Sequence, residues 1–236
     1  MSFIIAVHVS EGIVLASDSR TTYNDTETDA IGKPVTKLGV HYSDSSYKTF
    51  LTRSGVGIST CGNSSINGKS IASYIEDFIA RHQDKNVDAI KDLLLAYFQN
   101  IAPTLDTVFL VAGYMNTPGG APVSTLYRLT TKNQKIEKID TSLCGAIWNG
   151  ETDVMSRILT TLYLKRDGNY VKHSEYGILW NYFTLQDAID FAKYAVQATI
   201  DTIRFQKRVK TVGGPIDILV IKPTGSLWIA RKELHG

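Results

Sequence analysis

The order of elements that the sequence predicts is typical of an α+β protein. Strand-length apolar runs open the chain, two amphipathic helices follow, and further strands, a second helical group and two last strands complete it. Helices that come in pairs between antiparallel runs, and not singly between parallel strands, argue against a doubly wound sheet. Two sheets packed face to face, with helix pairs outside them, would accommodate every element.

The first elements are predicted to be hairpins. Residues 3–9 and 12–18 are β-rich runs joined by a two-residue turn. The polar stretch 21–46 predicts a long loop or a loose hairpin. Residues 47–52 and 55–60 then predict a second pair of strands.

Helices and strands alternate over the rest of the chain. Apolar residues recur at helical spacing over residues 65–82 and 87–101, and a shorter helix is expected at 151–164. Thr184 and Asp187 predict a capping box that opens a long helix to about Phe205. That helix is apolar around most of its girth, which is usual for a helix packed on two sides. The remaining strands are predicted at residues 106–115, 123–130, 134–140, 143–148, 216–222 and 226–231, with 134–140 expected to pair with 143–148.

Length and composition favour one domain spanning residues 1–236. A chain of 236 residues with 43% hydrophobic residues can bury a sizeable core without covalent staples. The net charge of +2 and the scattered basic residues indicate no nucleic-acid surface. Cys61 and Cys144 lack metal or redox spacing, so reduced thiols in the cytoplasm are expected. Neither a signal-peptide pattern nor a run of 18 apolar residues is present, so no membrane contact is expected.

Three residues predict a nucleophilic site. After removal of Met1, Ser2 would carry a hydroxyl and a free α-amine, so nucleophile and base would share one residue. An α-amine has a pKa of about 7.7–8.0 and can therefore accept the hydroxyl proton near neutral pH. A lysine beside it, Lys48, would keep the amine neutral and stabilise the developing oxyanion. A carboxylate, Asp18, would hold that lysine charged and oriented.

These residues resemble the start of proteasome β-type subunits and their bacterial homologues. Gly-Ile-Val-Leu-Ala-Ser-Asp-Ser-Arg at 12–20 is similar to the strand that follows the nucleophile in that family. Tyr-Lys-Thr-Phe-Leu around Lys48 is similar to the segment that carries the family's lysine. Residues 109–114 look like a later family strand. Residues 212–217 look closer to the small bacterial homologues, the ancestral β-subunit group, than to eukaryotic β subunits.

The resemblance implies a fold, an activity and an assembly. The fold would be the four-layer αββα sandwich of N-terminal nucleophile hydrolases, and the activity would be hydrolysis of peptides or unfolded proteins by Ser2, without a cofactor. The backbone N–H of Gly62 would point at the oxyanion. The chain would assemble with its own copies into a ring or ring-like stack, with an ATP-dependent unfoldase as a possible partner. The helices at 65–82 and 185–205 are expected to contribute to the contacts between copies.

Some family features are missing. Many β subunits use threonine where this chain has Ser2, and their supporting serine and aspartate have no evident counterpart here. Ser142 and Thr211 are candidates to replace them, and Arg20 is a further supporting candidate. The missing groups leave open an alternative, a catalytically silent shell or interaction protein on the same fold.

A nucleotide-binding site is the other alternative. Residues 62–70 end in Gly68-Lys69-Ser70, as a phosphate loop does, but five residues separate the two glycines where such a loop has four. Lys69 and Ser70 are instead expected inside the following helix. The five histidines show no metal-ligand spacing.

Overall fold

Two five-stranded sheets form the centre of the fold. The computed structural model of the chain describes residues 2–173 and 176–233. One sheet has the strand order β12-β1-β2-β15-β16 and the other has the order β11-β10-β9-β6-β5. The strands of the first are β1 (Phe3–Val9), β2 (Gly12–Ser17), β12 (Gly145–Gly150), β15 (Asp217–Lys222) and β16 (Gly225–Ala230). Those of the second are β5 (Thr49–Leu51), β6 (Gly57–Gly62), β9 (Thr107–Met115), β10 (Val123–Thr130) and β11 (Lys135–Ile139).

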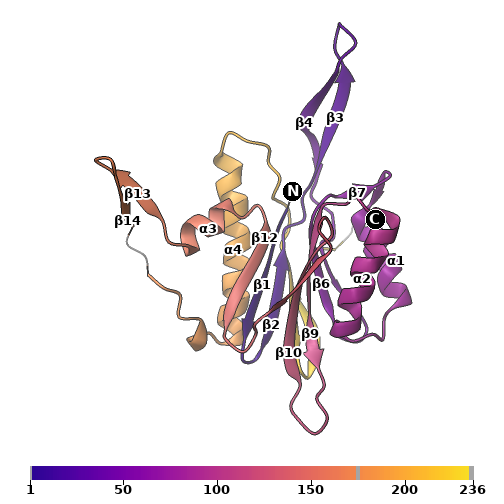
Figure 1. Ribbon diagram of the computed structural model, residues 1–236, viewed down its shortest axis with the longest axis vertical. Helices are drawn as coiled ribbons and strands as arrows, with labels where there is room; N and C mark the ends of the chain where they lie inside the picture. Colours follow the sequence, from indigo (N-terminus) through magenta and orange to yellow (C-terminus); the bar gives the residue numbers. More distant parts are fainter. Residues whose placement is uncertain (1, 174–175, 234–236) are drawn as a thin grey trace.

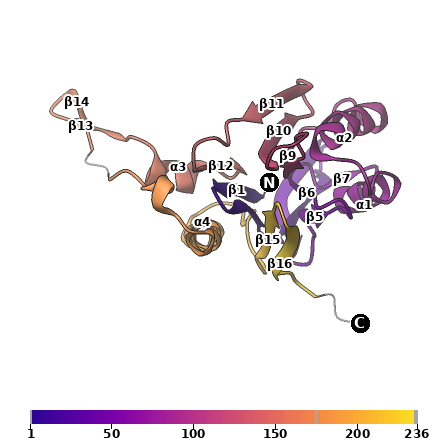
Figure 2. The ribbon, with the colours of Figure 1, turned by 90° about the horizontal axis from the view of Figure 1, so that it is seen from below.

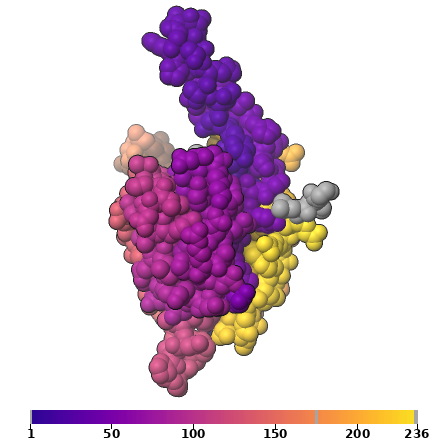
Figure 3. Space-filling view, turned by 90° about the vertical axis from the view of Figure 1, so that its right-hand side faces the viewer, coloured from indigo at the N-terminus to yellow at the C-terminus, as the bar shows by residue number. Residues whose placement is uncertain are grey.

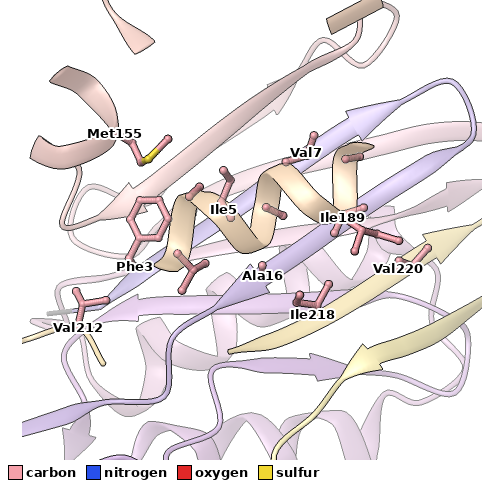
Figure 4. Close-up of a cluster of buried hydrophobic side chains, with 14 of the residues drawn as sticks. Phe3, Ile5, Val7, Ala16, Met155, Ile189, Val212, Ile218 and Val220 are labelled. Atoms are coloured by element: carbon pink, nitrogen blue, oxygen red, sulfur yellow. The ribbon is translucent and has the colours of Figure 1, made fainter. Parts of the chain in front are cut away.

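Each sheet is covered by helices on its outer side (Figure 2). The second sheet packs against α1 (Ile71–Arg81) and α2 (Val87–Ile101) through a cluster that includes Phe78 and Phe109. The first sheet packs against α4 (Leu185–Phe205), and Figure 4 shows the apolar side chains of this contact. A short helix, α3 (Asp153–Leu159), adds Met155 to the same cluster.

Side chains that alternate along a strand contribute to the hydrophobic clusters on both faces of the first sheet. In β1, Phe3 and Ile5 contact the α4 cluster, whereas Ile4 contacts a third cluster that includes residues of both sheets. Successive side chains of a strand point to opposite faces, so a strand buried on both faces must be apolar throughout. This is why β1 and β2 read as continuous apolar runs and not as alternating ones.

Several predicted elements are confirmed. β1 and β2 pair as the expected hairpin, and α2, β9, β10, β15 and β16 lie within a residue or two of their predicted bounds. The capping box is present, because Thr184 accepts from the Asp187 N–H and Asp187 accepts from the Thr184 N–H. α4 ends at Phe205, as expected.

The stretch 21–46 takes the second of its two expected forms. It is a hairpin of β3 (Thr21–Thr28) and β4 (Pro34–Ser43) with a register shift between Tyr23 and Asp25, and it projects from the body of the molecule (Figures 1 and 3). The next prediction along the chain is corrected. The helix expected at 151–164 is only α3, and a second hairpin, β13 (Tyr163–Arg166) with β14 (Asn169–Lys172), follows it.

The expected pairing of 134–140 with 143–148 is also wrong. β11 pairs with β10 and β12 pairs with β1, so the two strands belong to different sheets. α4 is not enclosed either, because its outer side leaves Tyr194 and Phe205 exposed. Among residues 2–173 and 176–233, no helix has the length and apolar character needed to cross a membrane.

Candidate active site

Ser2 lies at the start of β1 and is buried. β1 pairs with β12 so that Phe3 is opposite Gly150, and the Glu151 N–H donates to the Ser2 carbonyl oxygen at 2.8 Å. Gly150 has a φ of +95°, and a Cβ built there would lie 1.8 Å from that same oxygen. A glycine is therefore required for Ser2 to approach the end of β12 this closely.

Asp18 is a fully buried carboxylate with four hydrogen-bond donors. It directly follows β2, and its Oδ1 accepts from the Phe3 N–H at 3.0 Å and from Lys48 Nζ at 2.8 Å. Its Oδ2 accepts from the N–H groups of Arg20 at 3.0 Å and Gly213 at 3.1 Å. Charge-assisted bonds of this kind offset the cost of burying the carboxylate. Because Phe3 follows Ser2, the same carboxylate also holds the backbone next to the nucleophile candidate.

The ammonium group of Lys48 is buried beside Asp18. Lys48 precedes β5, its side chain is 6% exposed, and Nζ donates to Asp18 and, at 2.5 Å, to the carbonyl oxygen of Arg20. Burial lowers the pKa of Lys48, and the charge of Asp18 acts in the opposite direction. The ion pair that the sequence predicts is therefore formed.

A cleft of ≈ 340 Å³ opens onto Ser2 and Lys48. About half of its lining residues are serines or threonines, so the walls offer many hydrogen-bonding groups. One of them, the buried Thr60 Oγ1, has no hydrogen-bond partner within the described residues. The cleft is lined by Ser2, Arg20, Thr21, Thr22, Ser43, Ser45, Ser46, Tyr47, Lys48, Thr60, Cys61, Gly62, Asn63, Ser64, Ser70, Ile71, Ala72, Ser73 and Glu76.

Cys61 is the one thiol among these lining residues. Burial raises the pKa of its thiol to about 12, so it remains protonated near neutral pH. A protonated buried thiol is a poor nucleophile, which leaves the Ser2 hydroxyl as the better candidate.

Gly62 lies at the cleft, as the resemblance implies for an oxyanion donor. Its φ is +124°, and a Cβ there would lie 2.4 Å from the carbonyl oxygen of Asp106, so the position requires glycine. The helix expected to begin beside it starts later, at Ile71. The first turn of α1 nevertheless lines the cleft, so its positive dipole end acts there.

Residues 62–70 do not form a phosphate loop. β7 (Ser65–Ile66) and β8 (Lys69–Ser70) pair across Asn67 and Gly68, both with positive φ, as in a two-residue hairpin turn. Lys69 and Ser70 therefore precede the helix, with Ser70 as its N-cap. Lys69 Nζ donates to Asp77 at 2.7 Å, and the nucleotide-binding alternative loses its structural basis.

The three supporting candidates lie in different surroundings. Arg20 lines the cleft and forms a two-pronged ion pair with Asp44, at 2.6 and 2.7 Å. Thr211 Oγ1 donates to Glu151, the residue bonded to Ser2 through its backbone. Ser142 is not brought to Ser2: it follows β11, donates to Asp140, and lies near the other end of β1.

The structure adds groups that sequence reasoning missed. Gly213 donates to Asp18, Glu151 holds the Ser2 carbonyl, and Asp44 holds Arg20. Gly213 and Glu151 lie far along the chain from their partners, and Arg20 and Asp44 directly flank the paired ends of β3 and β4, so no short motif marks these contacts. The resemblance of residues 212–217 to the bacterial homologues does not by itself indicate that Gly213 donates a backbone hydrogen bond.

No protein-family model matches the chain, and no curated protein matches it by sequence. By structure, the chain has the proteasome-like fold of Anbu. Three similar solved structures are of Anbu proteins. Anbu from Hyphomicrobium sp. strain MC1 has 15% identity and a TM-score of 0.59, over 98% of this chain and 88% of that chain.

Two further solved structures give the same result. A (Gly-1) mutant of the Hyphomicrobium Anbu has 15% identity and a TM-score of 0.57, over 98% of this chain and 87% of that one. Anbu (ancestral beta-subunit) from Yersinia bercovieri has 15% identity and a TM-score of 0.55, over 96% and 86%. At this identity the likeness shows the fold alone.

Proposed function

We propose that the chain is a proteasome-like peptidase whose nucleophile is Ser2 after removal of Met1. The observation that carries the proposal is that Lys48, which is ion-paired with the buried Asp18, lines the same cleft as Ser2. A lysine is seldom buried without a strong reason, and a carboxylate with four donors holds this one in place.

The proposed reaction is acyl transfer followed by hydrolysis. Ser2 Oγ attacks the scissile carbonyl carbon while the α-amine of the same residue accepts the hydroxyl proton. Lys48 and the Gly62 N–H stabilise the oxyanion that forms. The proton then passes to the leaving nitrogen as the C–N bond breaks, and water hydrolyses the acyl-enzyme.

The same proposal extends to the whole chain. Residues 1–236 would form one domain with the four-layer αββα arrangement, acting on peptides or unfolded proteins without a cofactor. Copies of the chain would assemble into a ring or ring-like stack that encloses the nucleophiles, in the cytoplasm. An ATP-dependent unfoldase is a partner consistent with such an enclosure.

One observation favours the alternative, a catalytically silent protein on this fold. Ser142 is remote from Ser2, and Thr211 is bonded to Glu151, so neither stands in for the family's supporting serine in contact with the nucleophile. Intact mass spectrometry separates the two, because only the peptidase requires loss of one methionine.

Replacement of Ser2 tests the proposed activity. Ser2→Ala should abolish turnover of small fluorogenic peptide amides and leave the circular dichroism spectrum and melting temperature unchanged. Ser142→Ala is the matched control, since it removes a hydroxyl far from the cleft, and it should keep the wild-type rate. Undiminished activity in Ser2→Ala would reject Ser2 as the nucleophile.

A further inference from the structure

Glu151 is the residue directly opposite Ser2. Its N–H donates to the Ser2 carbonyl oxygen at 2.8 Å, and this bond continues the β1–β12 register one step beyond Phe3 and Gly150. Directly opposed residues of an antiparallel pair lie about 5.5 Å apart at Cα. Glu151 therefore lies next to the backbone nitrogen that becomes the α-amine when Met1 is removed.

The carboxylate of Glu151 is buried and held from two sides. Its side chain is 10% exposed, Oε1 accepts from Thr211 Oγ1 at 2.6 Å, and Oε2 accepts from Arg208 Nη1 at 3.3 Å. Thr211 lies two residues before Gly213, which donates to Asp18, so one segment supports both carboxylates.

Arg208 does not neutralise the charge of Glu151 completely. Its Nη2 also donates to Asp153 at 3.2 Å, so two carboxylates share one guanidinium. The three groups together keep one negative charge beside Ser2. A single positive charge, such as a protonated α-amine, would balance it.

Three other charged side chains line the cleft with Ser2. Lys48 is bonded to Asp18 and Arg20 to Asp44, whereas Glu76 is exposed on α1. The Cys61 thiol is neutral. Glu151 is therefore the carboxylate near Ser2 that shares its cation with a second carboxylate.

We propose that Glu151 is a positioning residue for the α-amine of Ser2. This inference rests on the proposed function, in which that amine is the base. Glu151 orients the amine and favours its protonated form, whereas Lys48 favours the neutral form, and the two charges together set the pH at which the amine can accept a proton. Thr211 acts through Glu151 and not by contact with the nucleophile. Glu151 keeps its own charge while the proton moves from Oγ to the amine and then to the leaving nitrogen.

The pKa of the amine tests this directly and needs no turnover. Periodate cleaves an N-terminal serine between the carbons that bear its amine and hydroxyl, and it reacts with the free-base amine. The pH dependence of that reaction, followed by intact mass, therefore reports the amine pKa. The protein is used with Ser2 exposed, by methionine aminopeptidase or by cleavage of a leader.

Two variants should move the amine pKa in opposite directions. Glu151→Gln should lower it by about one unit, because a neighbouring negative charge is lost. Arg208→Gln should raise it, because a cation is lost and Glu151 is left less compensated. Glu11→Gln, in the turn at the far end of β1, is the control and should leave it unchanged. An unshifted pKa in Glu151→Gln, or a shift of the same sign in both variants, would overturn the assignment.

Peptide hydrolysis measured in parallel separates the two proposals. The acid limb of kcat/KM should move to lower pH in Glu151→Gln and to higher pH in Arg208→Gln. A protein that shows both pKa shifts but hydrolyses no peptide rejects the peptidase function and supports the position of Glu151. If the protein hydrolyses peptides but its amine pKa is the same in both variants, the peptidase function is supported and the positioning role of Glu151 is rejected.

Discussion

Lys48 is costly to bury, and its surroundings show how the cost is met. The side chain lies within hydrogen-bonding distance of one carboxylate and one carbonyl oxygen, and both contacts are themselves inside the molecule. A purely structural ion pair in this place would be of little benefit, because apolar residues of equal volume often stabilise as well or better. Stability therefore does not explain why a lysine is buried here. Its position on the wall of the cleft is consistent with a role in the proposed reaction.

Substitutions at this pair should reduce activity strongly. Lys48→Ala should lower kcat/KM by about 10²-fold or more, because the charge that stabilises the oxyanion is removed. Lys48→Arg should restore little, since a planar guanidinium does not replace a compact ammonium. Asp18→Asn should resemble Lys48→Ala. Lys69→Ala is the control, because Lys69 forms an exposed pair with Asp77, and its rate should be normal. Normal rates in both Lys48 variants would show that Lys48 has no part in the chemistry.

The lowered pKa of Lys48 predicts the pH dependence. Because burial favours the neutral form, the ammonium loses its proton below the pKa of about 10.4 of an ordinary lysine. The alkaline limb of kcat/KM should therefore fall below that pH. The unfolded chain binds more protons between the folded and unfolded pKa values, so the free energy of unfolding should rise with pH across that window. Lys48→Met should remove the rise. An alkaline limb at or above 10.4 contradicts the assignment.

Site residues were predictable where a short segment has both a reactive side chain and a recognisable pattern of neighbouring residues. Ser2, Asp18 and Lys48 stand in or beside strands whose patterns identify them, and the structure brings Asp18 and Lys48 together. Glu151 and Gly213 were not predictable, because their contacts are made by backbone groups that the fold brings from far along the chain. Ser142 has a suitable side chain, but it precedes the start of β12, which pairs with the end of β1 that is remote from Ser2.

At the scale of elements, the end of β12 decides where Ser2 lies. Gly150→Ala would place a methyl group against the Ser2 carbonyl oxygen and add the strain of a positive φ, whereas Gly168→Ala adds similar strain with nothing within 4 Å. Gly168→Ala should therefore cost about 1–2 kcal/mol of unfolding free energy and keep its activity. Gly150→Ala should cost more and lose most peptide turnover. Denaturant unfolding and peptide assays measure both, and equal effects in the two variants would show that the end of β12 does not position Ser2.

The residues at two tight turns explain where the prediction of secondary structure was wrong. The helical pattern at 65–82 includes Asn67 and Gly68, a pair that favours a two-residue hairpin turn, and β7 and β8 form there. Asp167 and Gly168 have the same geometry between β13 and β14. β11 and β12 are close in sequence, yet each completes a different sheet, which no pattern within the two strands reveals.

At the scale of the molecule, the projecting β3–β4 hairpin exposes large apolar side chains. Leu38 is 65% exposed, Val40 56% and Tyr42 52%, on a two-stranded ribbon that would be marginal alone in water. α4 adds exposed aromatic side chains at Tyr194 and Phe205. Exposed apolar groups gathered on one element mark interaction surfaces, and the proposed assembly supplies a second copy of the chain to cover them.

Assembly should therefore be measurable and should depend on this hairpin. Light scattering at micromolar concentration should report a species several times the 26.1 kDa of one chain. Leu38→Ser with Val40→Ser should shift the mass toward the monomer, whereas Val123→Ser, at an exposed position of β10, should not. A monomer at every concentration would contradict the proposed enclosure of the nucleophiles.

The α+β class was predictable from the alternation of strand and helix groups, because that order leaves few ways to bury every apolar face. Two sheets with helices outside them were predictable in outline from the same order of elements. Of the projecting hairpins, β3–β4 was predicted only as the alternative to a long loop and β13–β14 was not predicted, because almost every side chain of these two ribbons is exposed and contributes nothing to the core.

Covalent labelling of Ser2 tests the central claim most directly. A peptide epoxyketone needs a nucleophilic hydroxyl and a free amine on the same residue to form a stable ring with both. Incubated with the purified protein and followed by intact mass and peptide mapping, it should add once, at Ser2, to chains that have lost Met1. Ser2→Ala and Lys48→Ala should remain unmodified. Chains that lack Met1 but gain no adduct at Ser2 would contradict the account.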